Sequence, residues 1–89
     1  MPYFVYVLWS SAGHKHYIGL TENLAQRLAQ HNGGESKWTK RYAGTWSLVW
    51  SEKCPDLSSA RRLENQLKRH KGGKGFYERT GLTRHSSGS

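Results

Sequence analysis

The pattern of hydrophobic and polar positions divides the chain into short elements separated by glycine, serine and proline. Residues 3–9 are rich in aromatic and β-branched types and have no polar face, which is typical of a strand covered on both sides. Residues 10–13 have the composition of a turn, and residues 15–20 can form the second strand of a hairpin. Tyr6 and Tyr17 then lie on neighbouring antiparallel strands, where their phenols can meet.

A helical pattern follows the hairpin. Gly19 allows a bend or a close backbone approach at the end of the second strand. Thr21 is suited to be the N-cap of a helix that runs to about Asn32, and Gly33-Gly34 is expected to end it. The apolar stripe of this helix is predicted to comprise four residues, namely Leu24, Ala25, Leu28 and Ala29.

A third strand and a second helix complete the pattern. Residues 46–52 alternate enough to form a strand, which Pro55-Asp56 ends. The second helix is expected to begin near residue 57 or 58 and to continue to about Lys71, before Gly72-Gly73. Its inward-facing positions are Ala60, Leu63 and Leu67.

The predicted order of elements is β-β-α-β-α, which indicates an α+β fold: a three-stranded antiparallel sheet flanked by helices. The length of the chain fits a single domain, expected over residues 1–82. Residues 76–80 are predicted to form either one short final helix or a packed tail. Residues 83–89 carry too little apolar surface to pack and are expected to be a disordered tail.

The net charge points to a class of partner. Fourteen Lys and Arg residues against six Asp and Glu residues give 14 − 6 = +8. Such an excess favours binding to a polyanion. The alternatives are a soluble basic protein without a nucleic-acid role, and a protein-interaction domain whose charge serves only solubility.

Several kinds of protein and site are disfavoured. No apolar run approaches the ~18 residues of a membrane span, and no signal peptide is apparent, so we expect a cytoplasmic protein without a membrane partner. Cys54 is the only cysteine, which excludes an intrachain disulfide and favours an inert, partly buried thiol. His14 and His16 have no acid or thiol nearby, so we expect exposed, solvated imidazoles rather than metal ligands.

Basic and aromatic residues alternate in the loop over residues 35–45 and reappear at the end of the second helix. Cations in this arrangement contact phosphates without reading sequence, and aromatic side chains can stack on unpaired bases. The alternative is that the aromatic residues pack over the small core. The predicted nucleic-acid-binding residues are Lys37, Trp38, Lys40, Arg41, Lys68 and Lys71.

The first helix carries two candidate catalytic residues. Arg27 and His31 are separated by four positions and therefore lie on one helix face, at the rim of the apolar stripe. A guanidinium suits bidentate contact with a phosphate, and an imidazole can transfer a proton near neutral pH. The alternative is a solvated Arg27 and a cationic His31 that favours the helix dipole.

The second helix carries a candidate metal ligand. Glu64 lies beside the apolar stripe of this helix, and its hard oxygen ligands suit one Mg²⁺ or Mn²⁺ ion, which keeps several waters and needs few protein carboxylates. The alternative is an exposed ion pair between Glu64 and Lys68, four residues further on.

These residues occur in a recognisable order: Phe4-Val5-Tyr6, then Tyr17-Ile18-Gly19, then Arg27 to Asn32, and finally Glu64. Over roughly residues 3–70 the chain resembles the GIY-YIG nuclease family, and within it the small, single-domain, uncharacterised branch typified by UPF0213 proteins. The first triplet keeps only the tyrosine of the family pattern.

The resemblance implies a role for each residue. Tyr6 would be the general base, Tyr17 a contact to phosphate or water, and Arg27 the phosphate clamp. His31 would transfer a proton or orient a neighbour, and Glu64 would be the sole ligand of one metal ion, while Gly19 would be structural.

The resulting hypothesis is a metal-dependent endonuclease domain that hydrolyses phosphodiester bonds in DNA, branched and single-stranded forms included. The alternative is a non-catalytic module on the same fold that binds DNA or RNA. We expect a monomer. Because a domain of this size has little surface for selecting a substrate, its activity is expected to be weak, selective for nucleic-acid structure, or dependent on a protein partner that supplies specificity.

Overall fold

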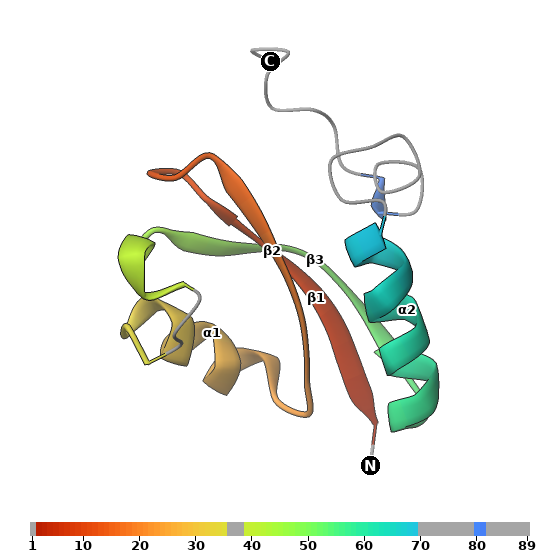
Figure 1. Ribbon diagram of the computed structural model, residues 1–89. Helices are drawn as coiled ribbons and strands as arrows, with labels where there is room; N and C mark the ends of the chain where they lie inside the picture. Colours follow the sequence, from red (N-terminus) through yellow and green to blue (C-terminus); the bar gives the residue numbers. More distant parts are fainter. Residues whose placement is uncertain (1, 36–38, 70–79, 82–89) are drawn as a thin grey trace.

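A three-stranded antiparallel sheet forms the centre of the molecule, seen here in a computed structural model that describes residues 2–35, 39–69 and 80–81. Strand β1 (Tyr3–Ser10) lies between β2 (Lys15–Thr21) and β3 (Trp46–Cys54). Helix α1 (Leu24–Asn32) covers one face of the sheet and α2 (Leu57–Arg69) covers the other (Figure 1). The predicted α+β architecture is therefore confirmed.

Strand β1 is buried on both faces, as its composition predicts, because it is the central strand. Val5 and Val7 point toward α2, whereas Tyr6 and Leu8 point toward α1. The core on the α2 side is built from Val5, Val7, Ile18, Cys54, Ala60, Leu63 and Leu67. The core on the α1 side is built from Tyr6, Leu8 and Trp46, with Tyr17, Leu24, Leu28 and Tyr42 packed against it.

Helix α1 begins differently from its prediction. Its N-cap is Asn23, whose side-chain oxygen accepts a hydrogen bond from the backbone N–H of Gln26 at 3.0 Å. The Thr21 hydroxyl instead accepts from the backbone N–H of Asn23 at 3.1 Å, because β2 continues through Thr21. Both residues are good caps, and the end of the strand decides between them.

The buried face of α1 is also narrower than predicted. Leu24 and Leu28 are half-buried as expected, but Ala25 and Ala29 are exposed. The fully buried residue of this helix is His31. The most deeply buried side chain of α1 is therefore polar, whereas the apolar pattern predicts that His31 lies at the rim of the buried face.

The C-terminal end of α1 is fastened to β3. The Asn32 amide donates to the carbonyl oxygen of Trp46 and accepts from its N–H, both at 2.9 Å. The Trp46 indole donates to the carbonyl oxygen of Thr39 at 3.0 Å. The predicted loop over residues 35–45 therefore includes a buried residue, Thr39, followed by a short 3₁₀ helix, η1 (Lys40–Tyr42).

The second half of the chain follows its prediction within the described residues. Strand β3 extends two residues beyond the expected end, and its pairing with β1 is irregular between Val7 and Leu8. Helix α2 begins at Leu57, and the Asp56 side chain accepts from the N–H of Ser59 at 2.7 Å.

Some predictions lie outside the described residues. These concern the helix end near Lys71 with Gly72-Gly73, most of residues 76–80, and the tail over residues 83–89. The domain bounds of 1–82 stay a prediction as well. Among the described helices, none is long and apolar enough to cross a membrane.

One glycine determines where the Tyr6 side chain can lie. Gly19 is directly opposite Tyr6 in the β1–β2 register, and the phenol ring lies over its Cα. A Cβ at position 19 would come within 2.5 Å of the Tyr6 Cζ and would also collide with the hydroxyl. The absence of a side chain at Gly19 therefore makes room for the Tyr6 phenol, which is the close approach that the sequence predicts.

We predict that Gly19→Ala destabilises the protein by about 1–3 kcal/mol, the usual cost of overpacking a filled site. The same substitution should cost much less in a Tyr6→Leu background, because the colliding ring is gone. Urea denaturation of the wild type, both single variants and the double variant measures this coupling. Equal costs in both backgrounds would contradict the stated role of Gly19.

Candidate active site

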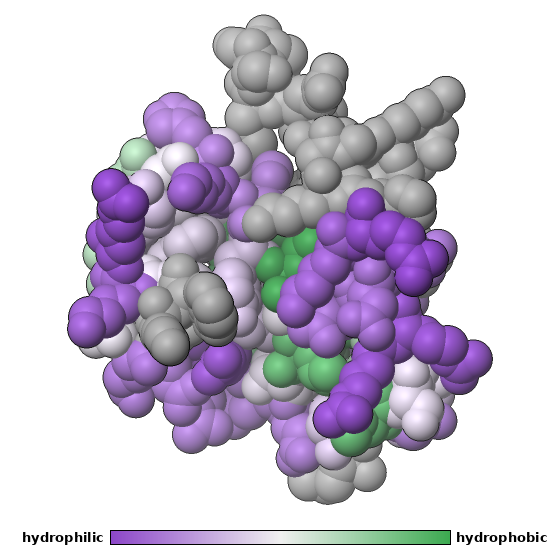
Figure 2. Space-filling view, viewed as in Figure 1, coloured by the Kyte–Doolittle hydropathy of each residue, from purple (hydrophilic) through white to green (hydrophobic). Residues whose placement is uncertain are grey.

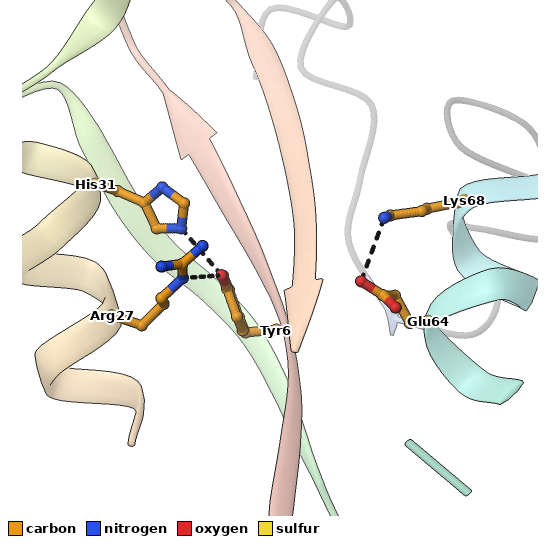
Figure 3. Close-up of polar contacts among 5 residues, drawn as sticks. All are labelled: Tyr6, Arg27, His31, Glu64 and Lys68. Atoms are coloured by element: carbon orange, nitrogen blue, oxygen red, sulfur yellow. Dashed lines mark hydrogen bonds and ion pairs between the residues drawn. The ribbon is translucent and has the colours of Figure 1, made fainter. Parts of the chain in front are cut away.

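The Tyr6 hydroxyl is the centre of a buried hydrogen-bond network between β1 and α1. It lies 2.9 Å from Nε2 of His31, and Nε of Arg27 donates to it at 3.3 Å (Figure 3). Tyr6 is 2% exposed and His31 is fully buried. Three of the candidate catalytic residues are thus in direct contact, and Tyr6 and His31 lie deeper than the rim of an apolar stripe.

The network continues on the far side of the imidazole. Nδ1 of His31 lies 2.6 Å from the hydroxyl oxygen of Thr39, which is itself fully buried. Both ring nitrogens of His31 therefore have a protein partner. Thr39 was not among the residues predicted from sequence, because a single threonine in a basic loop carries no periodic signal of burial.

Arg27 is held in place by two contacts. Its Nε donates to Tyr6, and its Nη1 donates to the side-chain oxygen of Gln30 at 3.0 Å. The guanidinium is half-buried and also faces Tyr17. The interpretation of Arg27 as a freely solvated surface residue is therefore wrong.

Burial sets the protonation states of this network. It lowers the pKa of His31 to about 4, and the positive charge of Arg27 acts in the same direction. Burial raises the pKa of Tyr6 to about 12, although the hydrogen bond from Arg27 acts against this rise. At neutral pH the network contains a neutral imidazole and a protonated phenol, so the alternative of a cationic His31 at the helix end is wrong.

Tyr17 lies beside the network and contacts it through its ring. The Tyr17 ring centroid is 4.8 Å from that of His31 and 6.3 Å from that of Tyr6. The two phenols therefore come close across the β1–β2 pair, as predicted. Tyr17 is half-buried on the edge strand, a position from which it can contact a substrate.

Glu64 stands apart from these four residues. Figure 3 shows its carboxylate reaching from α2 toward the strands, on the opposite side of them from the Tyr6 hydroxyl. It forms the alternative ion pair predicted from sequence, with Nζ of Lys68 at 3.2 Å. Its negative charge nevertheless contributes to the raised pKa of Tyr6. Glu64 is thus coupled to the network by its electric field rather than by contact.

The described residues offer one carboxylate, that of Glu64, to the single divalent ion implied by the family resemblance. Within the described ranges no group of three or more His, Cys, Asp or Glu side chains converges, so Glu64 would act as a single carboxylate ligand. Mg²⁺ and Mn²⁺ accept such sites because they keep most of their waters. The Glu64 side chain is 18% exposed, which leaves its oxygens accessible to an ion from solvent.

The predicted nucleic-acid-binding residues are only partly described. Lys40, Arg41 and Lys68 are exposed, as expected, whereas Lys37, Trp38 and Lys71 lie outside the described residues. Hydrophilic residues cover most of the visible face, and hydrophobic residues appear mainly in a strip beside α2 (Figure 2). A hollow of about 380 Å³ between the end of β3 and α2 includes none of the candidate catalytic residues.

The single cysteine and the two histidines near the hairpin turn each pack against the protein more than the sequence predicts. Cys54 is buried, more completely than predicted. His14 is exposed as expected, but its ring packs edge-on against Trp9 at 5.8 Å. The expectation of a solvated His16 is wrong, because its ring lies 4.8 Å from Trp9, the residue opposite it on β1.

We predict that acidification destabilises the protein through His31. The unfolded chain takes up this proton near pH 6.5, whereas the folded protein takes it up only near pH 4. The unfolded state therefore binds more protons between these values, and stability falls as the pH drops through this window. The expected loss is about 1–3 kcal/mol, measured by urea denaturation at pH 7 and pH 4.5. A His31→Asn variant should lack this component; an unchanged pH dependence in that variant would contradict the prediction.

The chain is similar to a known protein family. The model of the GIY-YIG catalytic domain matches residues 2–76. The chain is 37% identical over 68 residues to a UPF0213 protein of Vibrio cholerae, covering 75% of this chain and 66% of that protein. It is 34% identical over 67 residues to UPF0213 protein YhbQ of Escherichia coli, with the same coverage. A UPF0213 protein of Photorhabdus laumondii is 40% identical over 52 residues, covering 58% of this chain and 50% of that protein.

The chain thus spans between half and two thirds of the length of these relatives. The solution NMR structure of the UPF0213 protein BH0048 from Bacillus halodurans is 24% identical, with a TM-score of 0.49, covering 99% of this chain and 80% of that one. Because the family model covers residues 2–76 of 89, this chain belongs to the GIY-YIG catalytic domain family, a family of nucleases, and it is similar to the UPF0213 proteins within it.

Proposed function

We propose that this protein is a divalent-metal-dependent endonuclease domain that hydrolyses phosphodiester bonds in DNA. The observation that carries the proposal is the position of the Tyr6 hydroxyl. It is held between Arg27, which can only donate, and His31, a neutral imidazole that can accept. Membership of a nuclease family supports the same conclusion.

The network suggests how Tyr6 can serve as a base in spite of its raised pKa. A free phenolate is rare when the pKa is about 12. The phenol can instead take a proton from the attacking water while it passes its own proton to Nε2 of His31. The water oxygen then forms a bond to phosphorus, the bond from phosphorus to the leaving oxygen breaks, and the leaving oxygen takes up a proton from solvent. Tyr6 remains a neutral phenol throughout this exchange, and the proton left on His31 returns to solvent through Tyr6 once the product has left.

The substrate itself would make His31 a better acceptor. The pKa of His31 is low because the ring is buried beside the positive charge of Arg27. A phosphodiester bound to Arg27 brings a negative charge that offsets this effect. Arg27 has further N–H groups besides those bonded to Tyr6 and Gln30, and these can bind a non-bridging phosphate oxygen. A Mg²⁺ or Mn²⁺ ion on Glu64 would supply a Lewis acid for the developing charge.

Basic residues also lie beside Tyr42, which packs against the core on the α1 side. Nζ of Lys15 lies 5.8 Å and the Arg41 guanidinium 5.6 Å from the centroid of the Tyr42 ring. The Tyr42 ring packs over Gly13, where a Cβ would come within 2.6 Å of the ring. Tyr42 also contacts Trp46 edge-on, with centroids 6.4 Å apart. We propose that this Lys15–Tyr42–Arg41 surface binds the phosphate backbone.

A second function has its own support. The Glu64 carboxylate pairs with Lys68 and lies apart from the Tyr6 hydroxyl, which favours a module that binds nucleic acid without cutting it (Figure 3). The cationic surface would then be the functional site, and DNA or RNA would bind without metal. We further propose a cytoplasmic monomer that obtains substrate specificity from a protein partner.

We predict that Mg²⁺ or Mn²⁺ permits cleavage of supercoiled plasmid or branched DNA. Tyr6→Phe and Glu64→Gln should each lower the rate by roughly 100-fold or more, because one removes the proton carrier and the other the metal ligand. Glu35→Gln is the matched control, since Glu35 is exposed and outside the network. Tight binding of folded protein without cleavage under either metal would overturn the nuclease proposal in favour of the binding module.

We also predict a defined salt dependence of DNA binding. Removing one cation that touches a phosphate of duplex DNA should reduce the slope of log affinity against log salt by about 0.9. Lys15→Gln and Arg41→Gln should each show this reduction. Lys53→Gln is the control, because Lys53 is exposed at the far end of β3, where it lines the hollow beside α2. Equal slopes for all three variants would exclude the Lys15–Tyr42–Arg41 surface as the phosphate site.

A further inference from the structure

We infer that Thr39 is a positioning residue for the proposed reaction: it holds His31 in the tautomer that carries its proton on Nδ1, with Nε2 open toward the Tyr6 hydroxyl. The expected effect of Thr39 on cleavage rests on the proposed nuclease function, whereas its contact with the His31 ring does not. Thr39 touches His31 and not the substrate.

The hydrogen bonds of Tyr6 determine which nitrogen of His31 accepts. The phenol oxygen already accepts from Nε of Arg27, which has no acceptor capacity. The hydroxyl has one hydrogen of its own to donate. Among the described contacts of this buried side chain, Nε2 of His31 is the acceptor within reach, at 2.9 Å. Among these contacts, the hydroxyl hydrogen has an acceptor only in the tautomer whose Nε2 is unprotonated.

The remaining nitrogen then requires an acceptor. A neutral imidazole with an unprotonated Nε2 carries its hydrogen on Nδ1. The Thr39 hydroxyl oxygen lies 2.6 Å from Nδ1 and accepts this hydrogen. Without the Thr39 hydroxyl, the Nδ1–H of the fully buried His31 ring would lose this hydrogen-bond acceptor. The other tautomer would then become competitive, because it could donate toward Tyr6 instead.

Thr39 is itself fixed on the side away from the imidazole. Its carbonyl oxygen accepts from the Trp46 indole, and the backbone of Trp46 is bonded twice to Asn32. Asn32 follows His31 directly in α1, so the contacts form a closed circuit from His31 through Thr39 and Trp46 back to the same helix. These contacts hold the Thr39 hydroxyl within hydrogen-bond distance of Nδ1 of His31.

The test is the protonation pattern of the His31 ring, read by ¹⁵N NMR at pH 7 in isotope-labelled protein. We expect the wild type to show a protonated Nδ1 and an unprotonated Nε2. Thr39→Val, which replaces the hydroxyl with a methyl group of similar size, should shift the population toward the other tautomer. Thr39→Ser, which keeps the hydroxyl, should restore the wild-type pattern. A wild-type ring protonated on Nε2 would overturn the inference without recourse to any variant.

The cleavage assay provides the second measurement. Thr39→Val should lower the rate by about tenfold, the effect of removing one supporting hydrogen bond, and Thr39→Ser should recover most of it. A Thr39→Val protein with the wild-type ring pattern and rate would also overturn the inference. If the wild type binds DNA but never cuts it, the nuclease proposal fails, while the NMR result still decides whether Thr39 sets the tautomer.

Discussion

The hydrogen bond between the Tyr6 hydroxyl and Nε2 of His31 is the constraint on which the rest of this structure depends. Both groups are buried in a small domain, where an unpaired polar atom costs about 1–3 kcal/mol. Both groups therefore need a hydrogen-bond partner. The Tyr6 hydroxyl on β1 and Nε2 of His31 on α1 pair with each other, so this bond joins the strand to the helix. Gly19 leaves room for the phenol, and Thr39 completes the hydrogen bonds of the imidazole. Stability and candidate chemistry thus impose the same geometry.

The central strand separates two tasks by the alternation of its side chains. Val5 and Val7 meet the apolar face of α2, and this side supplies hydrophobic stabilisation. Tyr6, one residue away from each, faces α1 and its polar network. A one-residue shift of β1 would exchange the two sets, burying the phenol against α2 and the valines against His31. The register of the strand is therefore also a constraint on the site.

The sequence predicts most of the fold because glycine, proline and turn residues mark the boundaries of its elements. The aromatic and β-branched strand segments and the helical spacing of leucine and alanine then indicate which elements are strands and which are helices. The sequence singles out Tyr6, Tyr17, Arg27 and His31, which the structure brings together, but it gives no sign of Thr39, of the separation of Glu64 from this group, or of how deeply the side chains are buried. A helical projection gives the angle of His31 around α1, and only the packing of Thr39 and Tyr6 shows that the ring is enclosed. Thr21 failed as N-cap because strand pairing, a tertiary effect, reached one residue further than local propensity indicates.

The least local feature of the site is the relation between Glu64 and Tyr6. The carboxylate does not touch the phenol, yet its negative charge helps to raise the phenol pKa. A divalent cation on Glu64 would replace that negative charge with a positive one, and the same field would then favour loss of the proton from Tyr6. The ion and the phenol would be coupled across the sheet without sharing a ligand. In the proposed reaction Glu64 would therefore act on Tyr6 through the charge of its ion, without touching the phenol.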